Sequence, residues 1–239
     1  MNVQLFIPCF VDQLYPQTAF NTVKVLQKAG CNVTYNERQT CCGQPAFNAG
    51  FWNESKGVCA KFLDDFNPED VIVAPSASCV GFIRNYTKKL FAGSAEEINA
   101  ARVSKNIYEL SDFLVNVVKR TDFGATLEGT ATYHDSCAGL RECNIKNEPR
   151  QLLSQINGLT ITELQDVETC CGFGGTFAVK FEPIAIAMAE QKVEHALATN
   201  ADYLISTDLS CLMHLQGFIN NKNYPVRTMH LADALASGW

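Results

Sequence analysis

The stretch Cys41-Cys42-Gly43-Gln44-Pro45-Ala46 opens with two adjacent cysteines and a glycine, and Cys170-Cys171-Gly172-Phe173-Gly174-Gly175 opens the same way. Each Cys-Cys pair lies between two further cysteines, 32 or 33 positions upstream of the pair and 37 or 40 positions downstream of it. These flanking residues are Cys9, Cys79, Cys137 and Cys211. A pattern that recurs at an offset of 128 to 132 residues indicates an internal duplication.

Strands and helices are predicted to alternate around these cysteines in both halves of the chain. Periodicity predicts strands over 3–7, 31–35, 71–74, 130–134, 159–164, 203–206 and 226–229, and helices over 20–30, 51–66, from about Pro183, and at the C-terminus. Such alternation implies parallel sheets with right-handed crossovers. We therefore predict an α/β fold of two similar, Rossmann-like halves with mainly parallel sheets, in which every cysteine cluster follows a strand end.

The boundary between the halves is predicted near residue 120. Apolar residues at helical spacing predict one long helix over 100–118, and residues 121–129 have the composition of a linker. The first cysteine-rich half would then cover 1–120 and the second 121–239. A loop over 75–78 is expected to present Cys79.

Composition limits the class of protein. The net charge of −6 and a pI near 5.2 argue against binding to nucleic acid or to anionic membrane surfaces. The N-terminus lacks the basic region of a signal peptide, and no apolar run approaches the length of a membrane span. We expect a cytoplasmic protein with reduced thiols, in which 11 cysteines indicate metal binding or redox chemistry.

Four cysteines in each half are the predicted metal ligands. They are Cys9, Cys41, Cys42, Cys79, Cys137, Cys170, Cys171 and Cys211. Four thiolates converging from three loops suit a four-iron cluster or a structural zinc ion. The absence of a Cys-x-x-Cys pair favours iron–sulfur, although zinc is possible in the purified protein. A disulfide between adjacent cysteines is the other interpretation, and such a bond would be strained.

Other residues near the motifs have predicted roles as well. Gly43, Gly172 and Gly174 would let the backbone approach the bound group and direct amide N–H groups at it. Cys31 and Cys59 lie in apolar contexts and fit core packing, whereas Cys143 is undecided. His134, at a strand end beside Cys137, fits a satisfied structural histidine better than a proton relay or a hydrogen-bond donor to a cluster.

The sequence resembles the cysteine-rich CCG domain family, which includes the heterodisulfide reductase B subunit and the iron–sulfur subunit of glycolate oxidase. The resemblance covers essentially the whole chain and is carried by residues 41–46, 133–137, 170–177 and 229–230. The family motif ends in Cys-x-x-Cys, but Ser76 and Asp208 stand where the first of those cysteines would be. Heterodisulfide reductase B uses five cysteines for each non-cubane cluster. Four cysteines in each half therefore imply conventional [4Fe-4S] clusters, one or two in number. Asp208 would be a weak oxygen ligand of the second site, or that site would be incomplete.

The resemblance also implies a function and partners. The chain is expected to be an iron–sulfur electron-transfer subunit of a multi-subunit dehydrogenase that oxidises L-lactate to pyruvate, with no catalytic residue identified. It has neither a ferredoxin Cys-x-x-Cys-x-x-Cys motif nor a Gly-x-Gly-x-x-Gly fingerprint. A ferredoxin-type iron–sulfur subunit and a further subunit of a lactate-oxidising complex would supply those parts. The alternatives are a thiol–disulfide-type reductase that resembles heterodisulfide reductase B, and a zinc-stabilised assembly module.

Overall fold

The computed structural model describes residues 1–239 and places eight strands in two four-stranded sheets, ordered β2-β1-β3-β4 and β6-β5-β7-β8. The strands are β1 Asn2–Leu5, β2 Asn32–Tyr35, β3 Val71–Ala74, β4 Ile107–Glu109, β5 Thr126–Tyr133, β6 Asn157–Ile161, β7 Tyr203–Ser206 and β8 Arg227–His230. Every neighbouring pair is parallel. The predicted α/β fold with two similar parallel halves is confirmed.

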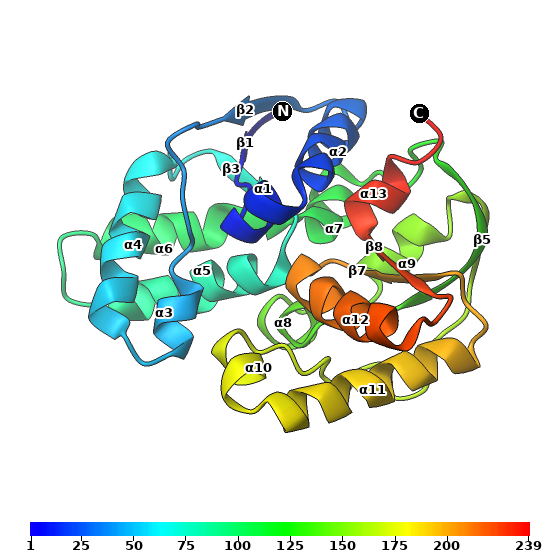
Figure 1. Cartoon of the computed structure of the whole chain (residues 1–239). Coiled ribbons are helices and arrows are strands. Elements are labelled where there is room, and N and C mark those ends of the chain that lie inside the picture. Colours follow the sequence, from blue (N-terminus) through cyan, green and yellow to red (C-terminus); the bar gives the residue numbers. More distant parts are fainter.

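Helices connect the strands and cover the sheets (Figure 1). In the first half they are α1 Cys9–Leu14, α2 Pro16–Lys28, α3 Gln44–Asn48, α4 Trp52–Asp65, α5 Ala77–Leu90, α6 Glu97–Asn106, α7 Leu110–Asp112 and the π-helix η1 Phe113–Val118. In the second half they are α8 Cys137–Glu142, α9 Glu148–Leu153, α10 Thr176–Lys180, α11 Glu182–Ala198, α12 Leu209–Lys222 and α13 Leu231–Leu235. None of these helices combines the length and the apolar character that crossing a bilayer requires.

The two halves repeat each other down to single hydrogen bonds. Beyond the end of β1 the Phe6 N–H donates to the Val73 carbonyl at 2.9 Å, and beyond the end of β5 the His134 N–H donates to the Ile205 carbonyl at 2.8 Å. The strands that carry these carbonyls, β3 and β7, occupy the same place in their sheets. Phe6 and His134 are therefore equivalent residues.

The predicted long helix over 100–118 is wrong. The structure ends α6 at Asn106 and places Ile107–Glu109 in β4, the strand at the edge of the first sheet. Ile107 and Glu109 are fully buried, and the Glu109 carboxylate accepts the N–H groups of Ser111 and Asp112 at the start of α7. The apolar spacing fits a helix, but pairing with β3 decides that these residues form a strand. Periodicity alone cannot distinguish a short buried strand from a short buried segment of helix.

The irregular segment between η1 and β5 covers residues 119–125 and ends before the predicted linker does, because β5 begins at Thr126. The first sheet lies within 2–109 and the second within 126–230. The domain limits of 1–120 and 121–239 stay a prediction.

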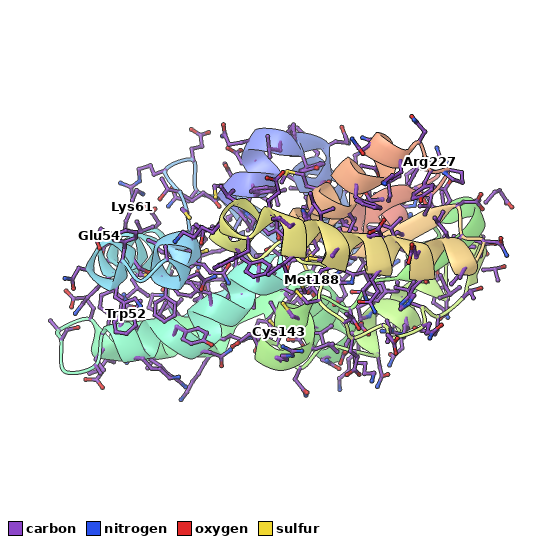
Figure 2. All side chains as sticks on the ribbon, turned by 60° about the horizontal axis from the view of Figure 1, so that its bottom comes forward. Trp52, Glu54, Lys61, Cys143, Met188 and Arg227 are labelled. Carbon is purple, nitrogen blue, oxygen red and sulfur yellow. The ribbon has the colours of Figure 1, made fainter.

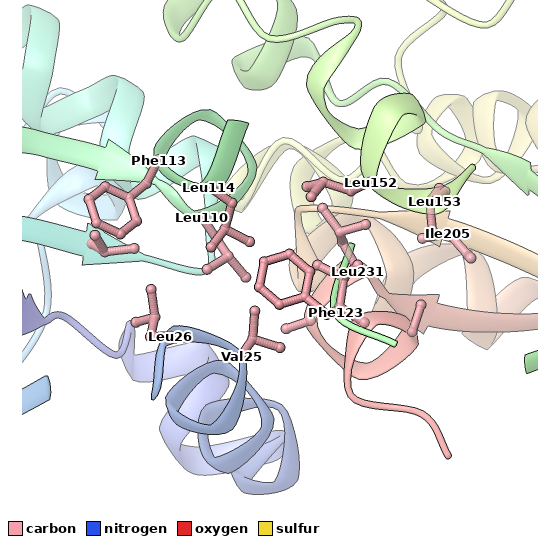
Figure 3. Packing of buried hydrophobic residues seen from close by; sticks show 14 of the residues in the cluster. Val25, Leu26, Leu110, Phe113, Leu114, Phe123, Leu152, Leu153, Ile205 and Leu231 are labelled. Carbon is pink, nitrogen blue, oxygen red and sulfur yellow. The ribbon is translucent and has the colours of Figure 1, made fainter. Parts of the chain in front are cut away.

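The largest hydrophobic core is shared by the two halves. Figure 3 shows Phe113 and Leu114 of η1 facing Phe123, with Leu152 of α9 and Leu231 of α13 on the other side. Two smaller cores lie farther out, one mainly in the first half and one in the second. Apolar burial is the dominant stabilising term in folding, so the shared core ties the halves together.

Helices that carry cysteines also cross between the halves. Helix α5 packs against α8, and a Cβ on Gly81 would lie 2.5 Å from the Glu142 Cβ. Cys143, labelled in Figure 2 beside this crossing, donates its thiol to the Ala77 carbonyl at 3.3 Å. In the reciprocal contact, α1 packs against α12. Each half therefore braces a cysteine-bearing helix of the other.

Candidate metal centres

The four predicted ligands of the first half come together. Cys9 is the first residue of α1, Cys41 and Cys42 precede α3, and Cys79 lies in the first turn of α5. The sulfur atoms of Cys42 and Cys79 are 3.4 Å apart. The Cys41 thiol is in hydrogen-bond contact with the thiols of both Cys42 and Cys9. We call these four residues the first thiol quartet.

The second half repeats this arrangement in a second thiol quartet. Cys137 is the first residue of α8, Cys170 and Cys171 follow β6, and Cys211 lies in the first turn of α12. Cys170 contacts the thiols of Cys137 and Cys171, and Cys171 also contacts that of Cys211. All 11 cysteines are free thiols in the structure.

Helix starts place one cysteine of each quartet deep in its site. The predicted loop over 75–78 is shorter than expected, because α5 begins at Ala77 and the Ser76 hydroxyl caps this helix by accepting the Cys79 N–H at 3.4 Å. Cys211 holds the matching position in α12. The positive end of a helix stabilises a thiolate, which is the form that binds metal.

The glycine of each Cys-Cys-Gly has a left-handed conformation, with φ of +94° at Gly43 and +93° at Gly172. Each donates its N–H to the sulfur of the first cysteine of the pair, at 3.4 Å in both halves. Space demands glycine at Gly172 as well, because a Cβ there would lie 2.7 Å from the Ala185 carbonyl oxygen and 2.9 Å from the Cβ of Met188 (Figure 2). Gly174 also has positive φ, and its contact with a bound group stays a prediction.

The electrostatics of the quartets favour a bound cation. Hydrogen bonds from Cys42 and Cys9 hold the pKa of Cys41 well below its usual range, and those from Cys137 and Cys171 do the same for Cys170. The pKa values of the donating thiols are raised, by those hydrogen bonds and by burial. Each quartet thus favours one thiolate by itself, and ionising all four sulfurs requires compensating positive charge. This donor set fits a thiolate-bound metal or iron–sulfur group.

Asp208 is engaged by the other half of the molecule. Its buried carboxylate accepts the Ser78 N–H at 2.9 Å and the Ser78 hydroxyl at 2.8 Å, and lies 3.4 Å from the hydroxyls of Ser76 and Ser210. Burial raises the pKa of this carboxyl, and the hydrogen bonds from the serines oppose that change. Serines therefore hold the carboxylate of Asp208, the predicted weak oxygen ligand.

The three cysteines outside the repeat have structural surroundings. Cys31 is buried in the shared core, and Cys59 donates its thiol to the Cys42 carbonyl at 3.3 Å, so the prediction of core packing is confirmed for both. Cys143 is buried where α5 meets the end of α8.

Two polar residues lie beside the second quartet, His134, whose expected role was structural, and Lys192, for which no role was predicted. His134 is fully buried, and neither ring nitrogen has a hydrogen-bond partner, so the expectation of a satisfied structural histidine is wrong. Burial lowers its pKa to about 3. Lys192 is also fully buried, and its Nζ donates to the carbonyls of Asp166 and Val167 at 3.0 and 3.1 Å. The sequence does contain a signal for a buried lysine, because Lys192 stands beside Val193 within the apolar face of α11.

Comparison with known proteins places this geometry in a family. The family model of the cysteine-rich domain CCG matches residues 3–84 and 131–216. Lactate utilization protein A 2 of Bacillus cereus is 41% identical over 239 residues, 100% of this chain and 99% of that protein. Lactate utilization protein A of Geobacillus kaustophilus is 42% identical, and the match covers 98% of this chain and 98% of that protein. Lactate utilization protein A of Halalkalibacterium halodurans is also 42% identical, and the match covers 98% of this chain and 96% of that protein.

Solved structures include one that shares the fold over the whole of this chain. It is a hypothetical protein from Helicobacter pylori, with a TM-score of 0.56 and 12% sequence identity. The match covers 100% of this chain and 49% of that one, so this chain spans about half the length of its structural neighbour. At this identity the likeness concerns the fold alone.

Proposed function

This chain belongs to the CCG cysteine-rich domain family, and on that premise we propose that it is an iron–sulfur electron-transfer subunit of a multi-subunit dehydrogenase. The observation that carries the proposal is the pair of thiol quartets, each gathered from three segments that follow strand ends. The proposed reaction of the complex is L-lactate oxidation to pyruvate. Its support is the name shared by full-length relatives, lactate utilization protein A.

The proposed ligands are the eight cysteines of the two quartets, with Gly43 and Gly172 donating N–H groups to sulfur. A bound cluster would supply one-electron transfer at each site. Residues of the chain bury one side of each quartet, through Cys42 and Cys171, and leave Cys9 exposed and Cys170 half-buried at the other. Such an open side would give a partner access to the bound group.

Exposed apolar side chains beside both motifs support the proposed partners. Phe51 and Trp52 follow α3 and are 59% and 62% exposed, and Phe181 and Ile184 follow α10 and are 52% and 55% exposed. Apolar residues that gather on a surface commonly mark contact with other proteins. A ferredoxin-type iron–sulfur subunit and a further subunit of a lactate-oxidising complex are the partners that we propose.

The test is metal analysis of protein purified without oxygen. Iron and sulfide assays and electron paramagnetic resonance should detect an iron–sulfur group in the wild type. Cys42→Ser and Cys171→Ser should each lose the iron of one half, and the double variant should lose all of it. Cys31→Ala, which removes a core thiol outside both quartets, is the matched control and should keep its iron.

Three results would contradict the proposal. Wild-type protein without iron, sulfide or broad absorbance at about 400 nm would overturn the iron–sulfur proposal. Stoichiometric zinc with no redox response after anaerobic reconstitution would favour an assembly module. Iron-free protein that still reduces a disulfide substrate, and loses this activity when Cys41 or Cys170 is alkylated, would favour a thiol–disulfide reductase.

A further inference from the structure

The surroundings of the two quartets differ at equivalent positions. Phe6 and His134 each stand three residues before the first cysteine of their quartet and make the same backbone hydrogen bond to the neighbouring strand. Both side chains are fully buried. One half thus has an aromatic hydrocarbon where the other has an imidazole.

A second difference lies on the helix that follows each motif. Gly43 packs against the Ser55 carbonyl of α4, and Gly172 packs against the Ala185 carbonyl of α11, which makes those two helix positions equivalent. Seven residues farther along, α4 has Phe62 and α11 has Lys192.

The first quartet therefore has an apolar wall. The Phe6 ring meets the Phe62 ring edge to face at 4.9 Å, and Phe66 lies beside both. None of these three side chains can bind a metal or donate a hydrogen bond.

The second quartet has a polar wall. A ring nitrogen of His134 and the sulfur atoms of Cys171 and Cys211 all lie within 4.8 Å of one another, and all three residues are buried. Both ring nitrogens lack any other partner. Buried polar groups are nearly always hydrogen-bonded or coordinated, so an imidazole without partners, with one nitrogen beside two thiols, points to a ligand between them.

Lys192 adds positive charge at the same place. Its Nζ uses two donors on the carbonyls of Asp166 and Val167, which fixes the segment leading to Cys170. Burial lowers the pKa of Lys192, and the negative charges of Cys171 and Cys170 oppose that change. A cation at this position offsets the negative charge of a thiolate-rich site.

We propose that the second site is a mixed thiolate–imidazole centre, in which His134 supplies a nitrogen ligand to the metal held by Cys171 and Cys211, whereas the first site is bound by thiolates alone. The inference rests on the proposed function in requiring a metal group at the second quartet. A neutral nitrogen ligand carries less charge than a thiolate, and histidine ligation raises the potential of iron–sulfur centres. The second centre should thus have the higher reduction potential.

The test uses anaerobic, reduced Cys42→Ser protein, in which only the second site should keep iron. Pulsed electron paramagnetic resonance with ¹⁵N-labelled histidine should detect a strongly coupled histidine nitrogen. His134→Phe should abolish that coupling, keep most of the iron and lower the reduction potential. Phe6→Leu should change neither the nitrogen coupling nor the reduction potential. His134→Gln, closer in size to histidine, replaces the first variant if His134→Phe does not fold.

The outcomes separate the two proposals. Iron present with only weak nitrogen coupling, or coupling unchanged in His134→Phe, overturns the imidazole ligand and leaves the proposed function standing. Zinc in place of iron overturns the proposed function. If zinc is found, replacing it with cobalt tests the role of His134. A visible absorption spectrum that differs between the wild type and His134→Phe supports ligation, and identical spectra refute it. A wild-type protein that binds no metal overturns both.

Discussion

Ser76 and Asp208 occupy equivalent positions before the cysteine-bearing helices α5 and α12, and their side chains meet, with the Ser76 hydroxyl 3.4 Å from the Asp208 carboxylate. Equivalent residues of two repeats touch each other only near the axis that relates the repeats. These are the positions at which the family motif has its additional cysteines. In this chain, the two positions join the halves.

Asp208→Ala should lower the free energy of unfolding by about 2 kcal/mol, because the Ser78 N–H and hydroxyl lose a buried charged acceptor. Asp208→Asn keeps one acceptor oxygen and should recover part of that loss. Urea unfolding under anaerobic conditions measures both, with exposed Glu54→Ala as control. Equal midpoints for wild type and Asp208→Ala would show that the contact is not stabilising.

Gly81→Ala should destabilise the protein by about 1–3 kcal/mol, because the added methyl group would meet the Glu142 Cβ where α5 crosses α8. Gly217→Ala is the matched control in α12, where nothing lies within 4 Å of the new Cβ. Alanine favours helix, so this variant should be neutral or more stable by up to about 1 kcal/mol. Thermal unfolding of both variants checks the contrast, and equal losses would contradict it.

Burial raises the pKa of Glu109 from 4.5 to about 7. The folded protein therefore holds this proton more tightly than the unfolded chain, and the resulting stability is complete below pH 4.5 and lost as the pH rises through 7. The total is roughly 3 kcal/mol. Glu109→Gln should flatten the fall in unfolding free energy between about pH 5 and 8. Exposed Glu194→Gln should keep the wild-type slope, and a parallel slope in Glu109→Gln would refute the assignment.

Lys192→Met should loosen the segment before Cys170, because the carbonyls of Asp166 and Val167 lose their donor. In a Cys42→Ser background, we expect a chelator to remove iron from this variant several-fold faster. Lys180→Met, which changes an exposed lysine near the same motif, should release iron at the parent rate. Identical rates for the two lysine variants would remove Lys192 from the site.

Much of the fold could be predicted because short apolar runs indicate buried strands and glycines indicate the turns and helix ends between them. The strands over 71–74 and 203–206 have the predicted bounds, and the convergence of the thiols followed from their places after strand ends. Strand β4 could not be predicted, because pairing with β3 decides it. The walls around the quartets escaped prediction for a similar reason. Tertiary packing leaves His134 without partners and places Lys192 against the segment before Cys170.

The core shared across the halves has a consequence for the origin of the chain. A half-length ancestor would expose the faces that now bury Phe113 and Leu231, and it could cover them only by pairing with a second copy of itself. Identical copies cannot diverge from each other. Two halves joined in one chain are free of that constraint, and this chain has phenylalanine at position 6 and histidine at the equivalent position 134.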